Sequence, residues 1–306
     1  MNGKAKTAVM VGIAAVTVAA LAGFRMERLA SRFSTHRRGT IGFDPGTRDA
    51  VKFVPNAKIA GRVVAEWIPD SPGRHPLIVF SHGYGGSKTQ SKALMNALAE
   101  KGYVVIAPDH KDAGALTRGG LSNLSEFREA EKWTDSNYRD RGDDIKSILD
   151  EMLRSDSWSQ TVDWDKVGLA GHSLGGYTVL ALAGAWPSWK LPGIKAILAL
   201  SPYAQPFILK GTLKSLTVPV MYQGGTLDLG ITPSIRKNSG AYEQTPSPAY
   251  YIEFQRAGHF AWTDLNPRFQ ASIAIYSAAF FDKFLLGKSN PTLQNKRDDV
   301  ADLRSK

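Results

Sequence analysis

Ser173 is the residue whose sequence context points most directly to chemistry. It lies in GHSLG, residues 171–175, after the short apolar run Lys166–Ala170 and before Gly176–Ala185, which favours a helix. G-x-S-x-G between a strand and a helix is the arrangement that lifts a serine hydroxyl onto a sharp, exposed turn. Glycines are needed there because a Cβ would collide with the adjoining strand and helix. An ordinary Gly-rich turn is the alternative, but the flanking elements favour Ser173 as a nucleophile.

A serine nucleophile needs a general base and a group that orients the base. His259 follows the predicted strand Ala249–Phe254, and Asp228 follows the predicted strand Val218–Gln223. Because the carboxyl ends of parallel strands meet at one edge of a sheet, both side chains should lie beside Ser173. A loop histidine or a turn aspartate can also be a plain surface residue, but the chain order Ser, Asp, His is that of a catalytic triad. The carboxylates that compete with Asp228 in sequence context are Asp109 and Asp264.

Acyl transfer also requires N–H donors for the negatively charged oxygen of its intermediate. One should be the backbone N–H of Leu174, directly after the nucleophile. The other should be the N–H of Tyr84, in the Gly-rich sequence SHGYGG at residues 81–86. A phosphate-binding loop is the competing interpretation, but the pattern G-x-x-x-x-G-K-S/T is absent. We expect His82 and His172 to have structural roles in hydrogen-bonded turns.

The elements that must position these residues alternate along the chain. The predicted strands are Arg62–Ile68, His75–Ser81, Tyr103–Ala107, Lys166–Ala170, Ile194–Leu200, Val218–Gln223 and Ala249–Phe254. The predicted helices are Lys88–Lys101, Asn137–Arg154, Gly176–Ala185 and a last helix from about Asn266 to Gly287. Strands that alternate with helices indicate an α/β fold with a mostly parallel sheet covered on both faces.

These elements predict one globular domain, residues 39–287, without an internal repeat or a second domain. Residues 31–60 are interpreted as a tether and entry segment, and residues 288–306 as a polar C-terminal tail. The stretch Lys111–Ser136 is too long and too irregular for a plain connector, which suggests a loop bordering the site. The short connection Ser201–Thr217 leaves room for a minimal cap only.

Composition narrows the class of protein. Of 306 residues, 43% are hydrophobic and 22% charged, which is ordinary for a globular protein, and no cysteine is present. Disulfides, thiolate metal sites and thiol nucleophiles are therefore excluded. The net charge of +10 is concentrated in residues 1–38, which hold seven Lys and Arg and one Glu, a net of +6 that leaves +4 for the rest. No basic helix face follows, so we expect no nucleic-acid partner.

An uncharged apolar run, Thr7–Phe24, lies between Lys6 and five arginines. Its length is between that of a signal-peptide core and a full membrane span of about 20 residues. The sequence ALA at residues 20–22 would allow cleavage after Ala22, whereas the arginines favour an uncleaved anchor, because positive charge tends to stay in the cytoplasm. We expect residues 1–38 to be a signal or anchor segment, so that the protein is either membrane-anchored or exported.

Several sequence blocks together resemble one superfamily. They are SHGYGG, APDHKDAG, DKVGLAGHSLGG, PVMYQGGTLD and RAGHF. On these blocks the chain from about Arg62 to Leu286 resembles the α/β-hydrolase superfamily. Within it, the dienelactone-hydrolase-like group, bacterial cutinases (polyester hydrolases) and platelet-activating-factor acetylhydrolases are similar. The resemblance implies an α/β-hydrolase fold with a minimal cap.

Each subgroup implies something different about the site. The cutinase pattern implies that Tyr84 donates an oxyanion N–H and that Tyr203 forms a wall of the acyl cleft; packing against the turn at 204–206 is the alternative for Tyr203. The acetylhydrolase pattern has its acid at the end of the strand after the nucleophile helix. This chain has Ser201 there, which favours Asp228 as the acid. Dienelactone hydrolases proper use a cysteine nucleophile, so Ser173 speaks against that substrate.

We therefore expect a serine carboxylic ester hydrolase that forms an acyl-enzyme on Ser173, without a cofactor or a metal. Short-chain esters, polyester ends and lipid acetyl groups would all suit an open site, and the sequence does not choose among them or define an oligomeric state. An amidase, a peptidase or a perhydrolase would share the triad. A non-catalytic envelope protein on this fold would be expected to lack a triad member, and none is missing.

Overall fold

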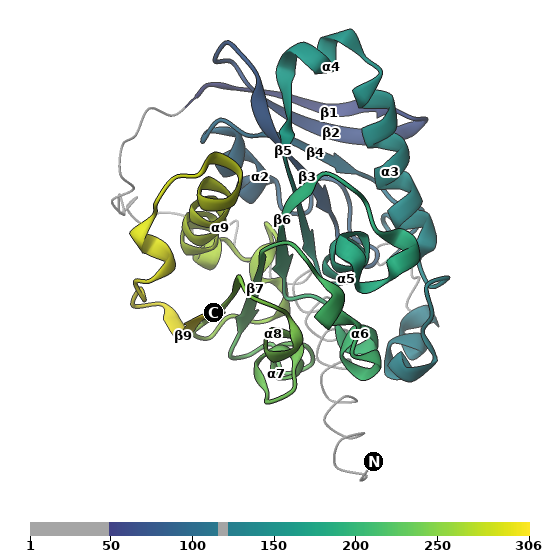
Figure 1. The fold of residues 1–306 in the computed structure, drawn as a ribbon, viewed down its shortest axis with the longest axis vertical. Helices are drawn as coiled ribbons and strands as arrows, with labels where there is room; N and C mark the ends of the chain where they lie inside the picture. The colour runs from purple at the N-terminus through teal and green to yellow at the C-terminus, as the bar shows by residue number, and fades with distance from the viewer. Residues whose placement is uncertain (1–48, 116–121) are drawn as a thin grey trace, which may run out of the picture.

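The computed structural model describes residues 49–115 and 122–306, and these residues form one nine-stranded sheet with helices on both faces. Figure 1 shows the sheet running through the middle of the molecule, with α2 and α9 on one side and α3 and α5 on the other. The predicted α/β-hydrolase fold, with a mostly parallel sheet, is confirmed.

The strand order in the sheet is β1-β2-β4-β3-β5-β6-β7-β8-β9. Pairing is parallel from β4 through β8 and antiparallel at β1/β2, β2/β4 and β8/β9. The strands are β1 Val51–Ile59, β2 Arg62–Pro69, β3 His75–Ser81, β4 Val104–Pro108, β5 Val162–His172, β6 Ile194–Leu200, β7 Val220–Gly225, β8 Ala249–Phe254 and β9 Val300–Ser305.

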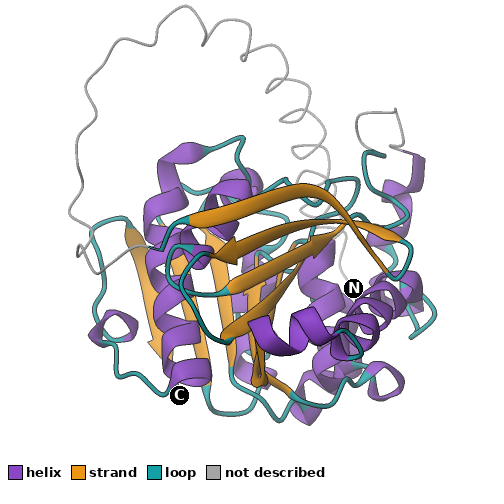
Figure 2. Cartoon of the chain, turned by 90° about the horizontal axis from the view of Figure 1, so that it is seen from above, coloured by secondary structure: helices purple, strands orange, loops and turns teal. Residues whose placement is uncertain are grey.

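The central strands are mostly apolar because both of their faces are buried. In β3, Leu77 and Val79 belong to one core cluster, while Ile78 and Phe80 belong to the cluster on the other face. Helices α3 (Arg139–Leu153) and α5 (Leu174–Leu180) cover the first cluster. Helices α2 (Lys92–Ala99) and α9 (Gln270–Leu286) pack against each other over the second. Figure 2 shows the twist of the sheet, with helices on both of its faces.

The remaining helices are short and lie between strands. They are α4 Asp156–Thr161, α6 Gln205–Lys210, α7 Thr232–Arg236 and α8 Ala241–Gln244. A π-helical turn at Ala181–Ala185 continues α5, and the two 3₁₀ segments Ser122–Arg128 and Ala130–Lys132 lie within the predicted long loop 111–136. The connection between β6 and β7 holds α6 and a 3₁₀ turn, which is a small excursion from the sheet.

Two predictions about the ends of the domain were wrong. The entry segment contains β1, an edge strand whose pairing with β2 shifts register between Val54 and Ala57, around Pro55. The supposed polar tail, residues 288–306, ends in β9, which pairs with β8. Its Val300 side chain is buried, so these residues belong to the domain rather than trailing from it.

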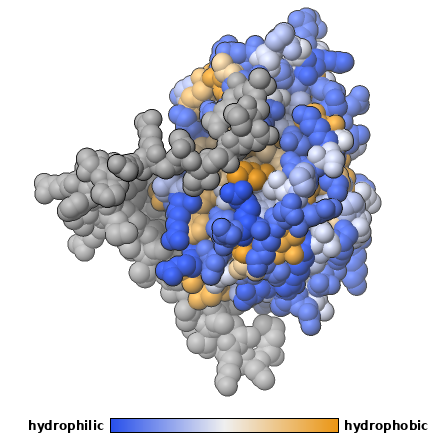
Figure 3. Space-filling view, turned by 90° about the vertical axis from the view of Figure 1, so that its left-hand side faces the viewer, coloured by the Kyte–Doolittle hydropathy of each residue, from blue (hydrophilic) through white to orange (hydrophobic). Residues whose placement is uncertain are grey.

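The N-terminal apolar run Thr7–Phe24 and its basic flank lie outside the described residues. Within residues 49–115 and 122–306, no helix is long and apolar enough to cross a membrane. Figure 3 shows one face of the molecule, on which the described surface is largely hydrophilic with smaller apolar patches.

Candidate active site

Ser173 occupies the sharp turn between β5 and α5. Its φ of 56° and ψ of −115° are strained for a non-glycine residue, as expected for a serine lifted out of a strand-to-helix turn. The turn leaves no room for side chains beside it. A Cβ added at Gly175 would lie 1.9 Å from the carbonyl oxygen of Ser81 on β3, and one at Gly171 would lie 2.2 Å from the Gly175 oxygen. The glycine spacing of the motif therefore permits the close approach of α5 to the sheet.

His259 reaches Ser173 from the loop that follows β8. Its Nε2 lies 3.0 Å from Ser173 Oγ, a hydrogen-bonding distance at which an imidazole can accept the hydroxyl proton. The His259 ring packs on the His172 ring, with centroids 4.9 Å apart. The backbone oxygen of His259 lies 2.9 Å from His172 Nε2, so both the ring and the main chain of the predicted base are fixed.

Asp228 lies just past the end of β7, on the far side of the His259 ring from Ser173. Its Oδ1 is 3.3 Å from His259 Nδ1, and only 3% of the residue is exposed. Burial alone would raise the pKa of Asp228, but the nearby charge and hydrogen bond of His259, together with the Ser201 hydroxyl, outweigh it. The pKa of Asp228 is therefore lowered, and the carboxylate stays ionised beside the imidazole.

The rival carboxylates are engaged elsewhere. Asp264 accepts the backbone N–H of Ala93 at 3.1 Å, and Asp109 pairs with Lys88 at 2.6 Å. Within the described residues, neither carboxylate forms a hydrogen bond or an ion pair with His259, so the geometry brings Asp228 and not its rivals to the predicted base.

Ser201 is a member of the site that sequence reasoning named only as a departure from a pattern. Its hydroxyl donates to Asp228 Oδ2 and lies 2.9 Å from His259 Nδ1. Its own backbone N–H donates to Gln223 O at 2.7 Å, which ties the residue to β7. The only signal in the sequence was its position, at the end of the strand that follows the nucleophile helix.

The two predicted oxyanion donors come from adjacent elements. Leu174 is the first residue of α5, so its N–H has no acceptor within the helix. Tyr84 lies in the oxyanion loop, a name used here for residues 82–86 after β3. A Cβ added at Gly83 would be 3.4 Å from the Ser173 Cβ, which shows how near this loop passes to the nucleophile.

His82 and His172 are buried and satisfied by hydrogen bonds, in line with structural roles. His82 accepts the backbone N–H of His110 at Nε2, at 3.1 Å, and its Nδ1 lies 2.7 Å from Gly83 O. His172 Nδ1 lies 3.1 Å from Gln90 Nε2, which donates to it. Burial, followed by the charge of His259, lowers the pKa of His172 to about 3, so its ring is neutral at ordinary pH.

An aromatic cluster lies beside the nucleophile turn. The Tyr84 ring meets Phe127 edge-on, with centroids 5.5 Å apart, and Phe127 in turn meets Tyr203 at 5.0 Å. Tyr203 is 7% exposed; its hydroxyl donates to Phe127 O at 2.8 Å, and its N–H donates to Ser173 O at 2.9 Å. Tyr203 thus touches the nucleophile turn through its main chain, while most of its ring packs against Phe127 and Trp133.

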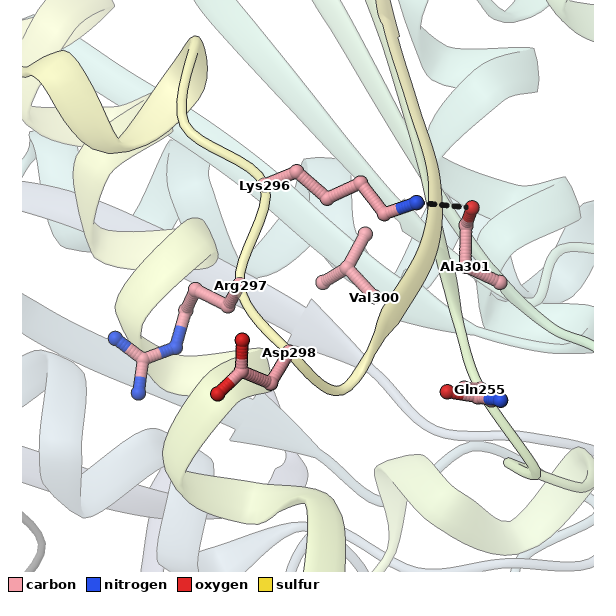
Figure 4. A pocket seen from close by; sticks show the side chains of 6 residues that line it. All are labelled: Gln255, Lys296, Arg297, Asp298, Val300 and Ala301. Atoms are coloured by element: carbon pink, nitrogen blue, oxygen red, sulfur yellow. Dashed lines mark hydrogen bonds between the residues drawn. The ribbon is translucent and has the colours of Figure 1, made fainter.

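Two cavities lie away from this site. One, of about 470 Å³, is formed by the segment before β9, and Figure 4 shows Lys296 reaching across it to the carbonyl oxygen of Ala301, 2.8 Å away. The other, of about 420 Å³, lies beside α2. Neither is lined by Ser173, Asp228 or His259. The hydrogen-bonded residues Ser173, His259 and Asp228 therefore lie outside both cavities, and an open site for an ester need not be a deep hollow.

Comparisons with known proteins agree with the α/β-hydrolase fold. A protein-family model described as Chlorophyllase matches residues 43–227, a stretch that includes Ser173 and ends immediately before Asp228. Cutinase est1 of Thermobifida alba is 28% identical over 72% of this chain and 64% of its own length. A platelet-activating factor acetylhydrolase of Canis lupus familiaris is 27% identical over 44% of this chain and 40% of its own length. This chain thus spans less than two thirds of the length of these curated relatives.

Proposed function

As the chain belongs to the chlorophyllase family of α/β hydrolases, we propose that it is a serine carboxylic ester hydrolase. The observation that carries the proposal is the unbroken chain of contacts from Ser173 Oγ through the His259 ring to the buried Asp228 carboxylate. Cutinases and acetylhydrolases among the relatives support an ester as the substrate class. An amidase, peptidase or perhydrolase would use the same groups, but no particular contact favours one.

In the proposed reaction, His259 Nε2 removes the Ser173 proton as Oγ attacks the ester carbonyl carbon. The carbonyl oxygen becomes an anion and accepts hydrogen bonds from the N–H groups of Tyr84 and Leu174. His259 then gives its proton to the leaving alcohol, and the acyl group stays on Ser173. Water, deprotonated by the same imidazole, releases the acid. Asp228 stabilises the imidazolium that forms in each half of the reaction.

The nucleophile can be tested directly. Ser173→Ala should abolish hydrolysis of p-nitrophenyl acetate and butyrate while changing the thermal midpoint little, because a turn hydroxyl contributes little to packing. A fluorophosphonate probe should label Ser173, as mapped by peptide mass spectrometry, and should not label the variant. Activity of the variant within tenfold of wild type, or a label on another residue, would remove Ser173 from the mechanism.

The choice among short-chain, polyester and lipid-acetyl esters depends on the acyl cleft, which we assign to Tyr84 and Tyr203. The rings are joined through Phe127, which supports a continuous apolar wall, although the deep burial of Tyr203 reduces the area it can offer. Tyr203→Ala should raise KM for butyryl esters more than KM for acetyl esters. The difference should correspond to a loss of about 1–2 kcal/mol of binding free energy. Tyr84→Ala keeps the backbone N–H, so it should weaken binding more than turnover. Equal effects on all esters would contradict the assignment.

We further propose that residues 1–38 carry the domain to a membrane or across it, as an anchor or as a cleaved signal. The apolar run 7–24 and its basic flank support this, and the nine-stranded sheet, which lies within residues 51–305, includes none of residues 1–38. N-terminal sequencing of protein from its native host distinguishes the two fates, because a start at Gly23 would refute the anchor.

A further inference from the structure

An ion pair between the fully buried Arg141 and the partly buried Asp112 lies beside the oxyanion loop. We propose that Arg141 and Asp112 are positioning residues that hold this loop, and with it the Tyr84 N–H, at the place where the anionic oxygen of the reaction forms. The inference rests on the proposed esterase function. It assigns the pair a role in turnover, in addition to any role in folding.

Arg141 reaches the loop from the first turn of α3, and its residue is fully buried. Its Nη1 donates to the carbonyl oxygen of His82 at 2.7 Å, and its Nη2 lies 3.3 Å from the carbonyl oxygen of Gly83. The guanidinium therefore binds the main chain of the loop on the side that precedes Tyr84. A rigid fork of N–H donors is suited to fix several acceptors at once, which a lysine cannot do.

Asp112 binds the oxyanion loop on the other side of Tyr84, at Gly85. It accepts Arg141 Nε at 3.0 Å and Nη2 at 2.8 Å, and its Oδ2 also accepts the backbone N–H of Gly85 at 2.8 Å. Burial would raise the pKa of Asp112, but the charge and hydrogen bonds of Arg141 and the Gly85 N–H outweigh it and lower the pKa. The carboxylate is therefore charged, and the two residues together bind the loop just before and just after Tyr84.

A second set of contacts holds the same loop through Gln90. Gln90 Oε1 accepts the N–H of Gly83 at 3.1 Å, and Gln90 Nε2 donates to His172 Nδ1. His172 in turn contacts the backbone oxygen of His259. The loop is thereby connected to the predicted base as well as to the ion pair, so a shift of the loop changes its position relative to the reacting atoms.

The choice of residues argues for positioning. A buried ion pair is a poor source of stability, because its desolvation cost offsets its attraction, and apolar residues of similar size serve as well. What apolar residues cannot provide is directed bonds to two carbonyl groups and one N–H of a glycine-rich loop. A displacement of about 1 Å in such a site can cost on the order of 10²-fold in rate.

The test compares wild type with Arg141→Lys and Asp112→Asn in the full chain. Arg236→Lys is the control, because Arg236, whose side chain is 43% exposed, pairs at 2.6 Å with the buried Glu253 and has no contact with the oxyanion loop among the described residues. For each protein, kcat and KM for p-nitrophenyl butyrate and the inhibition constant of phenylboronic acid are measured well below the thermal midpoint. Phenylboronic acid forms a tetrahedral adduct with a serine and places an oxygen in the oxyanion site.

Both site variants should lose about 10- to 100-fold in kcat and a similar factor in boronate affinity, with KM changed by less than about threefold. Arg236→Lys should change neither. A folded variant with unchanged kcat, or one whose loss is confined to KM with boronate affinity kept, would overturn the proposal. Failure of both variants to fold would also count against it, because the pair would then be needed for folding itself.

If Arg141→Lys alone does not fold, the kinetics of Asp112→Asn test the positioning role, because asparagine keeps the shape of the carboxylate. Wild type without ester hydrolysis would refute the proposed function. Active wild type with equally active variants would refute only the positioning role.

Discussion

At the scale of single residues, His259 Nδ1 lies near two oxygens. Ser201 Oγ is 2.9 Å from it and Asp228 Oδ1 is 3.3 Å from it. Since the Ser201 hydroxyl donates its proton to Asp228, it can only accept from the imidazole N–H. A proton on Nδ1 is thus shared between a neutral and a charged acceptor, and in the proposed reaction the carboxylate supplies the charge that stabilises an imidazolium.

This geometry separates the contributions of the two oxygens. Asp228→Asn should lower turnover by about 10⁴-fold, because the imidazole loses its charged partner and its productive tautomer. Ser201→Ala keeps the carboxylate and removes one hydrogen bond of about 1 kcal/mol, so a loss of about tenfold is expected. Asp264→Asn, as the control, should stay within about twofold of wild type. Steady-state kinetics on one ester measures all three, and a large loss in Asp264→Asn instead would mean that the acid is misassigned.

The sequence allowed the placement of Ser173, Asp228 and His259 because each follows a recognisable strand. It could not reveal Arg141, which lies in a predicted amphipathic helix where a charged residue normally faces solvent. Its partners are 29 and 59 residues away in the chain, and only the fold brings them together. Supporting residues of this kind have no local sequence signature.

At the scale of elements, the parallel strands were predictable and the two edge strands were not. The predicted strands His75–Ser81, Ile194–Leu200 and Ala249–Phe254 coincide with β3, β6 and β8, since mostly apolar runs of six or seven residues indicate buried strands clearly. β1 carries Pro55 at its register shift, and proline normally argues against a strand. β9 is short and charged, features that protect an edge from aggregation and also conceal it in the sequence.

The contribution of β9 can be measured by removing it. A chain that ends at Asp298 loses the pairing with β8 and the burial of Val300, worth about 2 kcal/mol or more. Its thermal midpoint should fall by about 4–10 °C, by the usual scaling for domains of this size. Activity should fall too, because β8 leads into the loop of His259. Val300→Ala should give a smaller shift, and an unchanged midpoint in the truncated chain would show that β9 does not support the sheet.

At the scale of the whole molecule, three neutral histidines are buried around the site. Burial is the first cause of the lowered pKa of His82, His110 and His172, with nearby positive charge from Arg141 or His259 as the second. In the unfolded chain a histidine binds a proton below about pH 6.5. The folded His172 resists protonation down to about pH 3.

The unfolded state therefore binds more protons than the folded state between these values, and stability falls as pH drops through this window. Because of His172 alone, the free energy of unfolding should fall by about 1.4 kcal/mol for each pH unit of acidification between about pH 6 and pH 4. The buried carboxylates Asp144 and Asp228 and the partly buried Asp112, whose pKa values are lowered, add to the loss only below about pH 4.

Urea unfolding at a series of pH values from 7.5 to 4.5 measures this dependence. His172→Gln should reduce the slope of the free energy of unfolding against pH by the equivalent of about one proton, which is about 1.4 kcal/mol per pH unit. The variant should also be less stable than wild type at pH 7.5. A free energy of unfolding that is flat or rises on acidification to pH 5 would contradict the assignment of neutral buried rings.

The tight contact of α5 with β3 at Gly175 also sets where useful variation can arise under laboratory evolution. Any side chain at this position displaces the nucleophile turn from the Ser81 carbonyl, and with it from the oxyanion loop. Libraries that randomise the turn would therefore return inactive clones, whatever substrate is selected. Libraries directed at the side chains of the aromatic cluster leave the reacting groups in their places, so we expect new acyl preferences among their clones.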